Sequence, residues 1–200
     1  MTSLRLCAAA LLALTTTATA GDGDDLSTVK DAYLGLRASG CDVTTIGSPV
    51  VARALRNVPY AMAGKIFKTA ELTFLFSHDG GWYTPKDANA DVAAEDRACV
   101  RALDKQEKFA RKRAPVKAAT EAVMIRNGSA VLGMYELAKA DFTKFRQSQK
   151  TTDGVRRWRL EFKAGSMAAL VTIECQLPEA EAKAKAPNWE KLECIRHAAG

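Results

Sequence analysis

Histidine is scarce in this sequence, and no two cysteines stand in a C-x-x-C arrangement. The 200 residues include two histidines, His78 and His197. Structural zinc sites use four Cys or His ligands, commonly in closely spaced pairs. The sequence therefore argues against a metal centre, and we expect neither a metal nor another cofactor.

Apolar runs of membrane-spanning length are also lacking. A transmembrane helix needs about 20 consecutive apolar residues, and the apolar run from Leu6 to Leu14 is shorter. Arg5 precedes this run and the small residues Ala18-Thr19-Ala20 follow it. That order is typical of a secretory signal peptide, here residues 1–20 with cleavage near Ala20. We therefore expect an exported protein without a transmembrane segment. A core helix at the start of the chain is the alternative.

No strong excess of charge of one sign is present either. The formal net charge is +6 at pH 7. A modest positive charge favours anionic surfaces but is weaker than a dedicated nucleic-acid binder requires. An anionic envelope component or another protein is thus a more suitable partner than nucleic acid.

The sequence does contain an even set of cysteines after the signal segment: Cys41, Cys99, Cys175 and Cys194. An even number in an exported chain argues for disulfides. Three pairings are possible. We favour Cys41–Cys99 and Cys175–Cys194, because each pair would then staple one half of the chain.

Hydrophobic periodicity changes near residue 115. From Leu26 to Arg113 the apolar residues follow helical spacing, and after Pro115 they follow the alternation of strands, as in Trp158, Leu160 and Phe162. We therefore predict an α+β protein. Its parts are a signal peptide (residues 1–20), a small helical domain (21–115) and an antiparallel β region (116–200).

Local signals place the helix boundaries. Ser27 and Ser48 are suitable N-caps for the first two helices. Pro59 should kink or break the second helix, because proline lacks the amide donor and clashes with the preceding turn. A third long helix is predicted to begin at Asp91 and to end before Pro115.

Other signals place the strands. Val123 to Arg126 and Ser129 to Leu137 flank Asn127-Gly128, which predicts a hairpin. Gly165-Ser166 should join the next two strands, and the charged segment 178–187 should form a solvated loop or a short exposed helix.

The stretch from Leu55 to Pro85 carries a distinctive order of residues. It contains Arg56-Asn57, then Tyr60-Ala61 and a helix-ending Gly64, and it closes with Trp82-Tyr83. This order resembles the YARHG domain, a small bacterial module usually found outside the cytoplasm, over roughly residues 50–113. The resemblance implies a secreted or periplasmic location in a bacterium, and it names no reaction. Typical members carry Arg-His where this chain has Met62-Ala63.

The same segment supplies candidate core residues. Aromatic side chains provide large apolar area for a core between short helices, and glycine allows the chain to reverse after a helix. We expect the domain core to be anchored by Tyr60, Gly64, Phe67, Phe76 and Trp82. Ile66 beside Phe67 is also expected to be buried.

A basic cluster at the end of the third helix is the candidate binding site. The cluster consists of Lys105, Lys108, Arg111, Lys112, Arg113 and Lys117. Of these we take Lys108, Arg111, Lys112 and Arg113 as the residues that could bind an anionic ligand. The alternative is a solvated helix end whose positive charges complement the helix dipole.

No catalytic constellation is recognisable, so we assign no catalytic residue and expect a non-catalytic binding or structural module of the cell envelope or exterior. His78-Asp79 is interpreted as a surface turn, because neighbours in a turn rarely reach each other in catalytic geometry. The alternative is an envelope-associated hydrolase that uses carboxylates such as Glu71, Asp79 or Asp87, since paired carboxylates leave little sequence signature.

Overall fold

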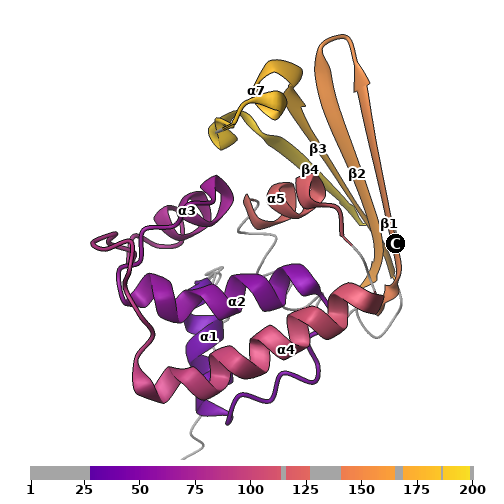
Figure 1. Ribbon diagram of the computed structural model, residues 1–200. Helices are drawn as coiled ribbons and strands as arrows, with labels where there is room; N and C mark the ends of the chain where they lie inside the picture. The colour runs from indigo at the N-terminus through magenta and orange to yellow at the C-terminus, as the bar shows by residue number, and fades with distance from the viewer. Residues whose placement is uncertain (1–27, 114–115, 127–140, 165–168, 186, 199–200) are drawn as a thin grey trace, which may run out of the picture.

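The computed structural model describes residues 28–113, 116–126, 141–164, 169–185 and 187–198. Figure 1 shows helices from the N-terminal half on one side and a sheet from the C-terminal part on the other. The predicted α+β class is confirmed. The predicted signal segment, residues 1–20, lies outside the described residues.

Helices make up most of the described chain before residue 127. They are α1 (Val29–Ala38), α2 (Pro49–Met62), α3 (Ala70–Ser77), the 3-10 turn η1 (Ala94–Asp96), α4 (Arg97–Arg113) and α5 (Ala118–Arg126). A capping box begins α1, in which Thr28 and Asp31 each accept a hydrogen bond from the backbone of the other. The Ser48 hydroxyl accepts from the amide of Val51 and caps α2. The predicted cap at Ser27 lies outside the described residues, and Thr28 is the cap observed.

Two helix boundaries differ from those predicted. The α2 helix does not break at Pro59 but continues to Met62. Pro59 lies in the last turn and is buried, so the loss of one backbone donor is offset by the packing of its neighbours. The third long helix begins later than Asp91, because the chain first forms η1 and enters α4 at Arg97.

An aromatic cluster forms the core next to α3. Phe76 is fully buried, and the Phe67 and Trp82 rings pack on it with centroid distances of 5.2 and 5.7 Å. Tyr83 is buried beside them, and its hydroxyl donates to the Lys65 carbonyl over 2.6 Å. Ile66 differs from the prediction, because its side chain is 46% exposed.

Gly64 ends α2 in a conformation that favours glycine, with φ of +82°. Its carbonyl accepts hydrogen bonds from the amides of Lys86 and Asp87. A Cβ atom at this position would lie 3.1 Å from the carbonyl oxygen of Thr84. The segment that carries Trp82 and Tyr83 therefore returns directly onto the end of α2.

The C-terminal part is a four-stranded antiparallel sheet. Its strands are β1 (Asp141–Thr152), β2 (Val155–Ala164), β3 (Ala169–Pro178) and β4 (Glu193–Ala198), in the spatial order β1-β2-β3-β4. Between β3 and β4 lie the exposed helix α7 (Glu179–Lys183), which matches the predicted short exposed helix, and the 3-10 turn η2 (Trp189–Lys191). The predicted turn at Gly165-Ser166 falls outside the described residues.

The start of the β region was predicted incorrectly. Val123 to Arg126 were expected in a strand but form the end of α5, in which Val123, Met124 and Ile125 are all buried. Three consecutive buried residues are compatible with a helix that is covered on more than one side. Alanine, which has the highest helix propensity, also occurs three times in α5. The predicted hairpin turn Asn127-Gly128 lies outside the described residues.

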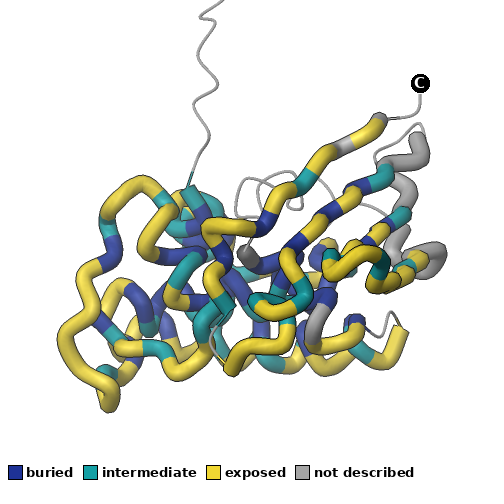
Figure 2. The backbone as a smooth tube through the Cα atoms, turned by 90° about the horizontal axis from the view of Figure 1, so that it is seen from above, coloured by how far each residue is buried: buried dark blue, intermediate teal, exposed yellow. Residues whose placement is uncertain are grey.

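Burial links the helices and the sheet into one core. Trp158, Leu160, Ile173 and Leu177 on the sheet belong to the same buried cluster as the apolar faces of α1, α2 and α5. Figure 2 shows buried positions alternating with exposed ones along the strands. One face of the sheet is therefore covered and the opposite face is exposed to solvent.

Two disulfides join the pairs favoured from the sequence. Cys41 and Cys99 tie the loop after α1 to α4, with Cα atoms 5.4 Å apart. Cys175 and Cys194 lie directly opposite each other on β3 and β4, with Cα atoms 4.1 Å apart.

Candidate functional site: a basic groove between α2 and α4

The predicted anion-binding residues do not share one surface. Arg111 turns toward the protein and pairs with Glu107 and Glu121. Lys108 and Lys112 lie on the outward side of α4, and the Arg113 guanidinium lies 5.3 Å from the centre of the exposed Phe109 ring. Because a helix places successive side chains around its axis, neighbours in sequence are divided between faces.

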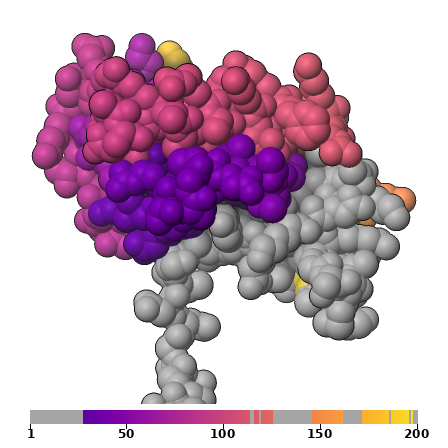
Figure 3. Space-filling model, turned by 90° about the horizontal axis from the view of Figure 1, so that it is seen from below, coloured from indigo at the N-terminus to yellow at the C-terminus, as the bar shows by residue number. Residues whose placement is uncertain are grey.

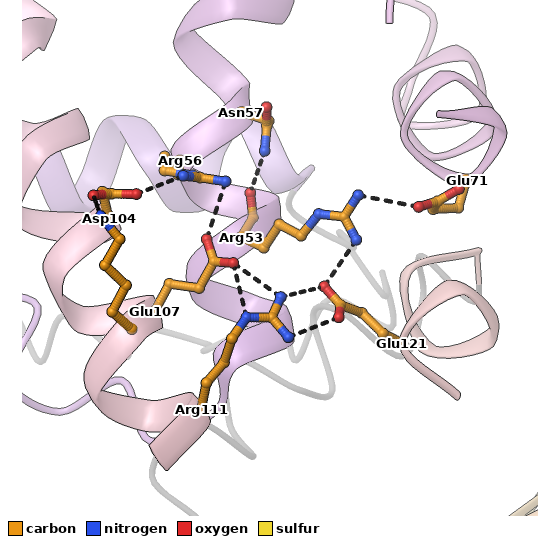
Figure 4. A network of polar contacts seen from close by, with 9 residues as sticks. Arg53, Arg56, Asn57, Glu71, Asp104, Glu107, Arg111 and Glu121 are labelled. Carbon is orange, nitrogen blue, oxygen red and sulfur yellow. Dashed lines mark hydrogen bonds and ion pairs between the residues drawn. The ribbon is translucent and has the colours of Figure 1, made fainter. Parts of the chain in front are cut away.

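Arg111 belongs to an ion-pair network that joins four helices (Figure 4). Glu121 of α5 accepts hydrogen bonds from Arg53 of α2 at 2.8 Å and from Arg111 of α4 at 2.7 and 2.9 Å. Arg53 also reaches Glu71 of α3 at 3.0 Å. The Glu121 side chain is only 5% exposed. This network holds the helices together, so Arg111 has a structural role.

The arginine partners in this network favour the ionised form of Glu121. Burial alone would raise the pKa of Glu121, but the hydrogen bonds from Arg111 and Arg53 outweigh it and hold that pKa below its usual range. Glu121 is therefore ionised at neutral pH and keeps both arginines in place.

Arg56 connects this network to the surface of the helical half. Its guanidinium pairs with Asp104 at 2.7 Å and with Glu107 at 3.1 Å. Asp104 also accepts a 2.6 Å hydrogen bond from Lys108. The hydrogen bond from Lys108, aided by the charges of Lys108 and Arg56, lowers the pKa of Asp104.

A groove of about 600 Å³ opens at this point between α2 and α4. Its charged lining consists of Arg56, Lys65, Arg101, Lys105 and Lys108, with Asp104 among them. The lining thus holds five cations and one carboxylate, and Arg56 and Lys108 pair with that carboxylate. The side chains of Arg101 and Lys105 are exposed and have no ion-pair or hydrogen-bond partner within the described part of the chain. In the view from below, α4 forms a continuous strip of the molecular surface (magenta to rose, Figure 3).

Three uncharged residues of the YARHG-like segment complete the lining: Asn57, Tyr60 and Val100. Asn57 donates its side-chain amide to the Arg53 carbonyl at 2.8 Å. Tyr60, expected as a core anchor, lies outside the buried core and lines the groove instead, with the Lys65 Nζ 5.1 Å from its ring centre. An aromatic ring and an amide therefore stand beside the cations.

Sequence reasoning placed Lys105 and Lys108 in a basic cluster but missed the other charged residues of this lining. Arg101, Lys105 and Lys108 are spaced by four and three residues, which places them on one helix face. That spacing was a usable signal within α4. The contributions of Arg56 and Lys65 depend on the packing of α2 against α4, which no local pattern reports.

The residues considered for catalysis have structural partners. Asp79 accepts hydrogen bonds from the amide of Val29 at 2.9 Å and from the Trp82 indole at 2.8 Å, so it joins the start of α1 to the aromatic cluster. The His78 ring stacks on Phe74 with a centroid distance of 3.9 Å. Both belong to the turn that follows α3.

The other two candidate carboxylates are also engaged locally. Glu71 pairs with Arg53 at 3.0 Å, and Asp87 accepts a 2.8 Å hydrogen bond from the amide of Asn89. His197 is exposed on β4. Nowhere among the described residues do three His, Cys, Asp or Glu side chains gather in a way that could hold a metal ion.

Comparison with known proteins assigns the segment that contains this groove. A family model matches residues 49–108, from the first residue of α2 to within α4. The matching model is that of the YARHG domain, so residues 49–108 are similar to this domain. The sequence-based expectation of that family is confirmed, and the chain beyond residue 108 has no family match. Searches of curated proteins and of solved structures give no match.

The YARHG domain and the two disulfides fit an exported module. Each helix in the part of the chain that the structure describes is too short or too polar to cross a membrane. The groove is built mainly from the YARHG domain, since all its charged lining residues lie within 49–108.

Proposed function

We propose that this protein is an exported, non-catalytic binding module that holds an anionic ligand in the groove between α2 and α4. The proposal rests on the composition of the groove lining, which holds five cations and one carboxylate. Such a concave surface attracts negative charge, and fixed cations in it would hold a carboxylate, sulfate or phosphate group.

The unpaired cations are the central part of this site. Arg56 is held by Asp104 and Glu107, so its position is defined before a ligand arrives. Arg101 and Lys105 are free to pair with a ligand. Because Arg56 is already held in place, its side chain loses less conformational entropy when a ligand binds.

The first experiment measures binding of anionic probes by titration calorimetry at low salt, using the purified disulfide-bonded protein. The probes are inorganic phosphate, trigalacturonate and long polygalacturonate. The double variant R101E/K105E should weaken binding at least about 10-fold, because two attractive contacts become repulsive. The control K150E reverses one charge, half the change made by R101E/K105E, near the β1–β2 turn, which lies far from α4 in Figure 1.

Two results would contradict the proposal: no probe binds, or R101E/K105E binds every probe as the wild type does. Incubation of the wild type with polygalacturonate should release no reducing ends. Turnover that disappears in E71Q, D79N or D87N would instead support the carboxylate hydrolase.

Export by a cleaved signal peptide is part of the same proposal. It is supported by the order of charged, apolar and small residues in 1–20 and by the two disulfides. Expression in a bacterium should give an extracytoplasmic product whose intact mass corresponds to a chain that begins at Gly21. A cytoplasmic product that retains residues 1–20 would refute it.

A further inference from the structure

The cations of α4 continue beyond the groove in a single row. They are Arg97, Arg101, Lys105, Lys108 and Lys112, spaced by four, four, three and four residues. All five are exposed, although Arg97 pairs with Asp91 and Lys108 with Asp104. On the opposite side of the helix, Cys99, Leu103 and Ala110 are buried. The row therefore follows the outward face of α4 over nearly its whole length.

The geometry of this row suits an extended ligand. The first and last cations are fifteen positions apart on the α-helix, a distance of about 22 Å along its axis, with about 4.5–6 Å between consecutive cations. A small anion is held best by cations that converge on one point. Cations that repeat along a line match negative charges that repeat along a chain.

The groove beside the row indicates a second property of the ligand, the presence of hydroxyl groups. Asp104 lies between Arg56 and Lys108 and presents a carboxylate that can accept hydrogen bonds from hydroxyl groups. Tyr60 offers an aromatic ring and Asn57 an amide in the same lining. Hydroxyl donors, an apolar ring face and regularly spaced negative groups occur together in a chain of acidic sugars.

We infer that the ligand of the groove is an acidic polysaccharide that lies along α4 from Arg97 to Lys112, an inference that rests on the proposed function. A polynucleotide fits less well. Proteins that bind single strands stack successive bases on several aromatic rings, and the described lining of the groove holds one, Tyr60.

The test compares ligands of different length on the disulfide-bonded protein. A galacturonate dodecamer is long enough to span the row, and a trimer covers only part of it. The dodecamer should bind at least about 10-fold more tightly than the trimer, and its affinity should fall steeply with salt because several ion contacts form at once.

Variants at the centre and at the end of the row separate the two proposals. R101E/K105E should weaken both ligands, whereas K112E should weaken the dodecamer at least about 3-fold and leave the trimer unchanged. K150E should affect neither. Glutamate is a good helix former, so the exposed positions on α4 tolerate these changes.

Other outcomes overturn the inference in recognisable ways. If the trimer and dodecamer bind equally and both depend on Arg101 and Lys105, the groove is a site for a small anion, and only the proposed function stands. If an oligothymidine of twelve nucleotides binds more tightly than the dodecamer, the ligand is a polynucleotide. If no anionic ligand depends on Arg101 and Lys105, both proposals fail.

Discussion

Replacement of Glu121 by glutamine should destabilise the protein by about 2–3 kcal/mol at pH 7. The Glu121 side chain is 5% exposed and accepts hydrogen bonds from Arg53 and Arg111. Breaking a fully buried pair costs about 3–5 kcal/mol, because the remaining charge is left without a partner. The lower value applies here because the Arg111 side chain is 34% exposed and can turn toward water.

The effect of E121Q should depend on pH. The pKa of Glu121 is lowered in the folded protein by its two arginine partners. The ion pair therefore stabilises the fold fully above the unfolded-state pKa of about 4.3 and loses this effect as the pH falls through the lower folded-state value. The difference in unfolding free energy between wild type and E121Q should shrink below about pH 4.

Urea unfolding followed by circular dichroism, with both disulfides intact, would measure this difference at pH 7 and at successively lower pH. The matched control is E190Q, since Glu190 is exposed and no side-chain ion pair of it is found within the described residues. This control should change stability by less than about 0.5 kcal/mol. The reasoning is refuted if E121Q behaves like E190Q at pH 7, or if its effect is equally large at pH 3.

Three other changes test the fold. Replacing both Cys41 and Cys99 by alanine should cost about 4 kcal/mol, because the bridge closes a loop with a sequence separation of 58; a loss below about 1 kcal/mol in urea unfolding would contradict this. Gly64→Ala should cost about 1–2 kcal/mol, since φ is +82° and the new methyl group would meet a backbone carbonyl, and a melting temperature equal to that of the wild type would disprove it. Asp79→Ala should cost about 1–2 kcal/mol and shift the emission of Trp82 to longer wavelength, because the indole loses its acceptor; an unchanged spectrum would show that this bond is unimportant.

Local signals were sufficient where one short segment determines the structure. The Ser48-Pro49 start of α2, the turn at Gly64 and the alternation in β2 were all predicted correctly, because capping, positive φ and strand periodicity are properties of a few neighbouring residues. The disulfide pairs followed from the division of the chain into two halves.

The predictions failed where contacts between distant segments determine the structure. The β1 strand is polar and was not predicted, although Asp153-Gly154 forms a two-residue turn with positive φ at both positions, a strong hairpin signal that was overlooked. The end of α5, Val123 to Arg126, was assigned to a strand, because its apolar residues did not show which elements would cover them. Tyr60 was placed in the core because aromatic residues usually are buried, yet its position on α2 directs it to the groove.

The same limit applies to the candidate site. Arg111 and Lys108 look alike in a run of basic residues. Only the partner that α5 supplies, Glu121, distinguishes the internal ion pair of Arg111 from the surface cation Lys108. Glu121, the acceptor for two arginines, lies outside the basic run and could not be identified without the fold.

The segment that matches the YARHG domain is shorter than the unit that its contacts require. A peptide cut to residues 49–108 would contain Cys99 without Cys41, and Arg53 without Glu121. In an oxidising buffer its single thiol would form bridges between copies, and dimers of such a peptide would reflect the cut and not the native protein. An autonomous version of this domain would have to extend from α1 through α5, so that both the bridge and the four-helix network remain complete.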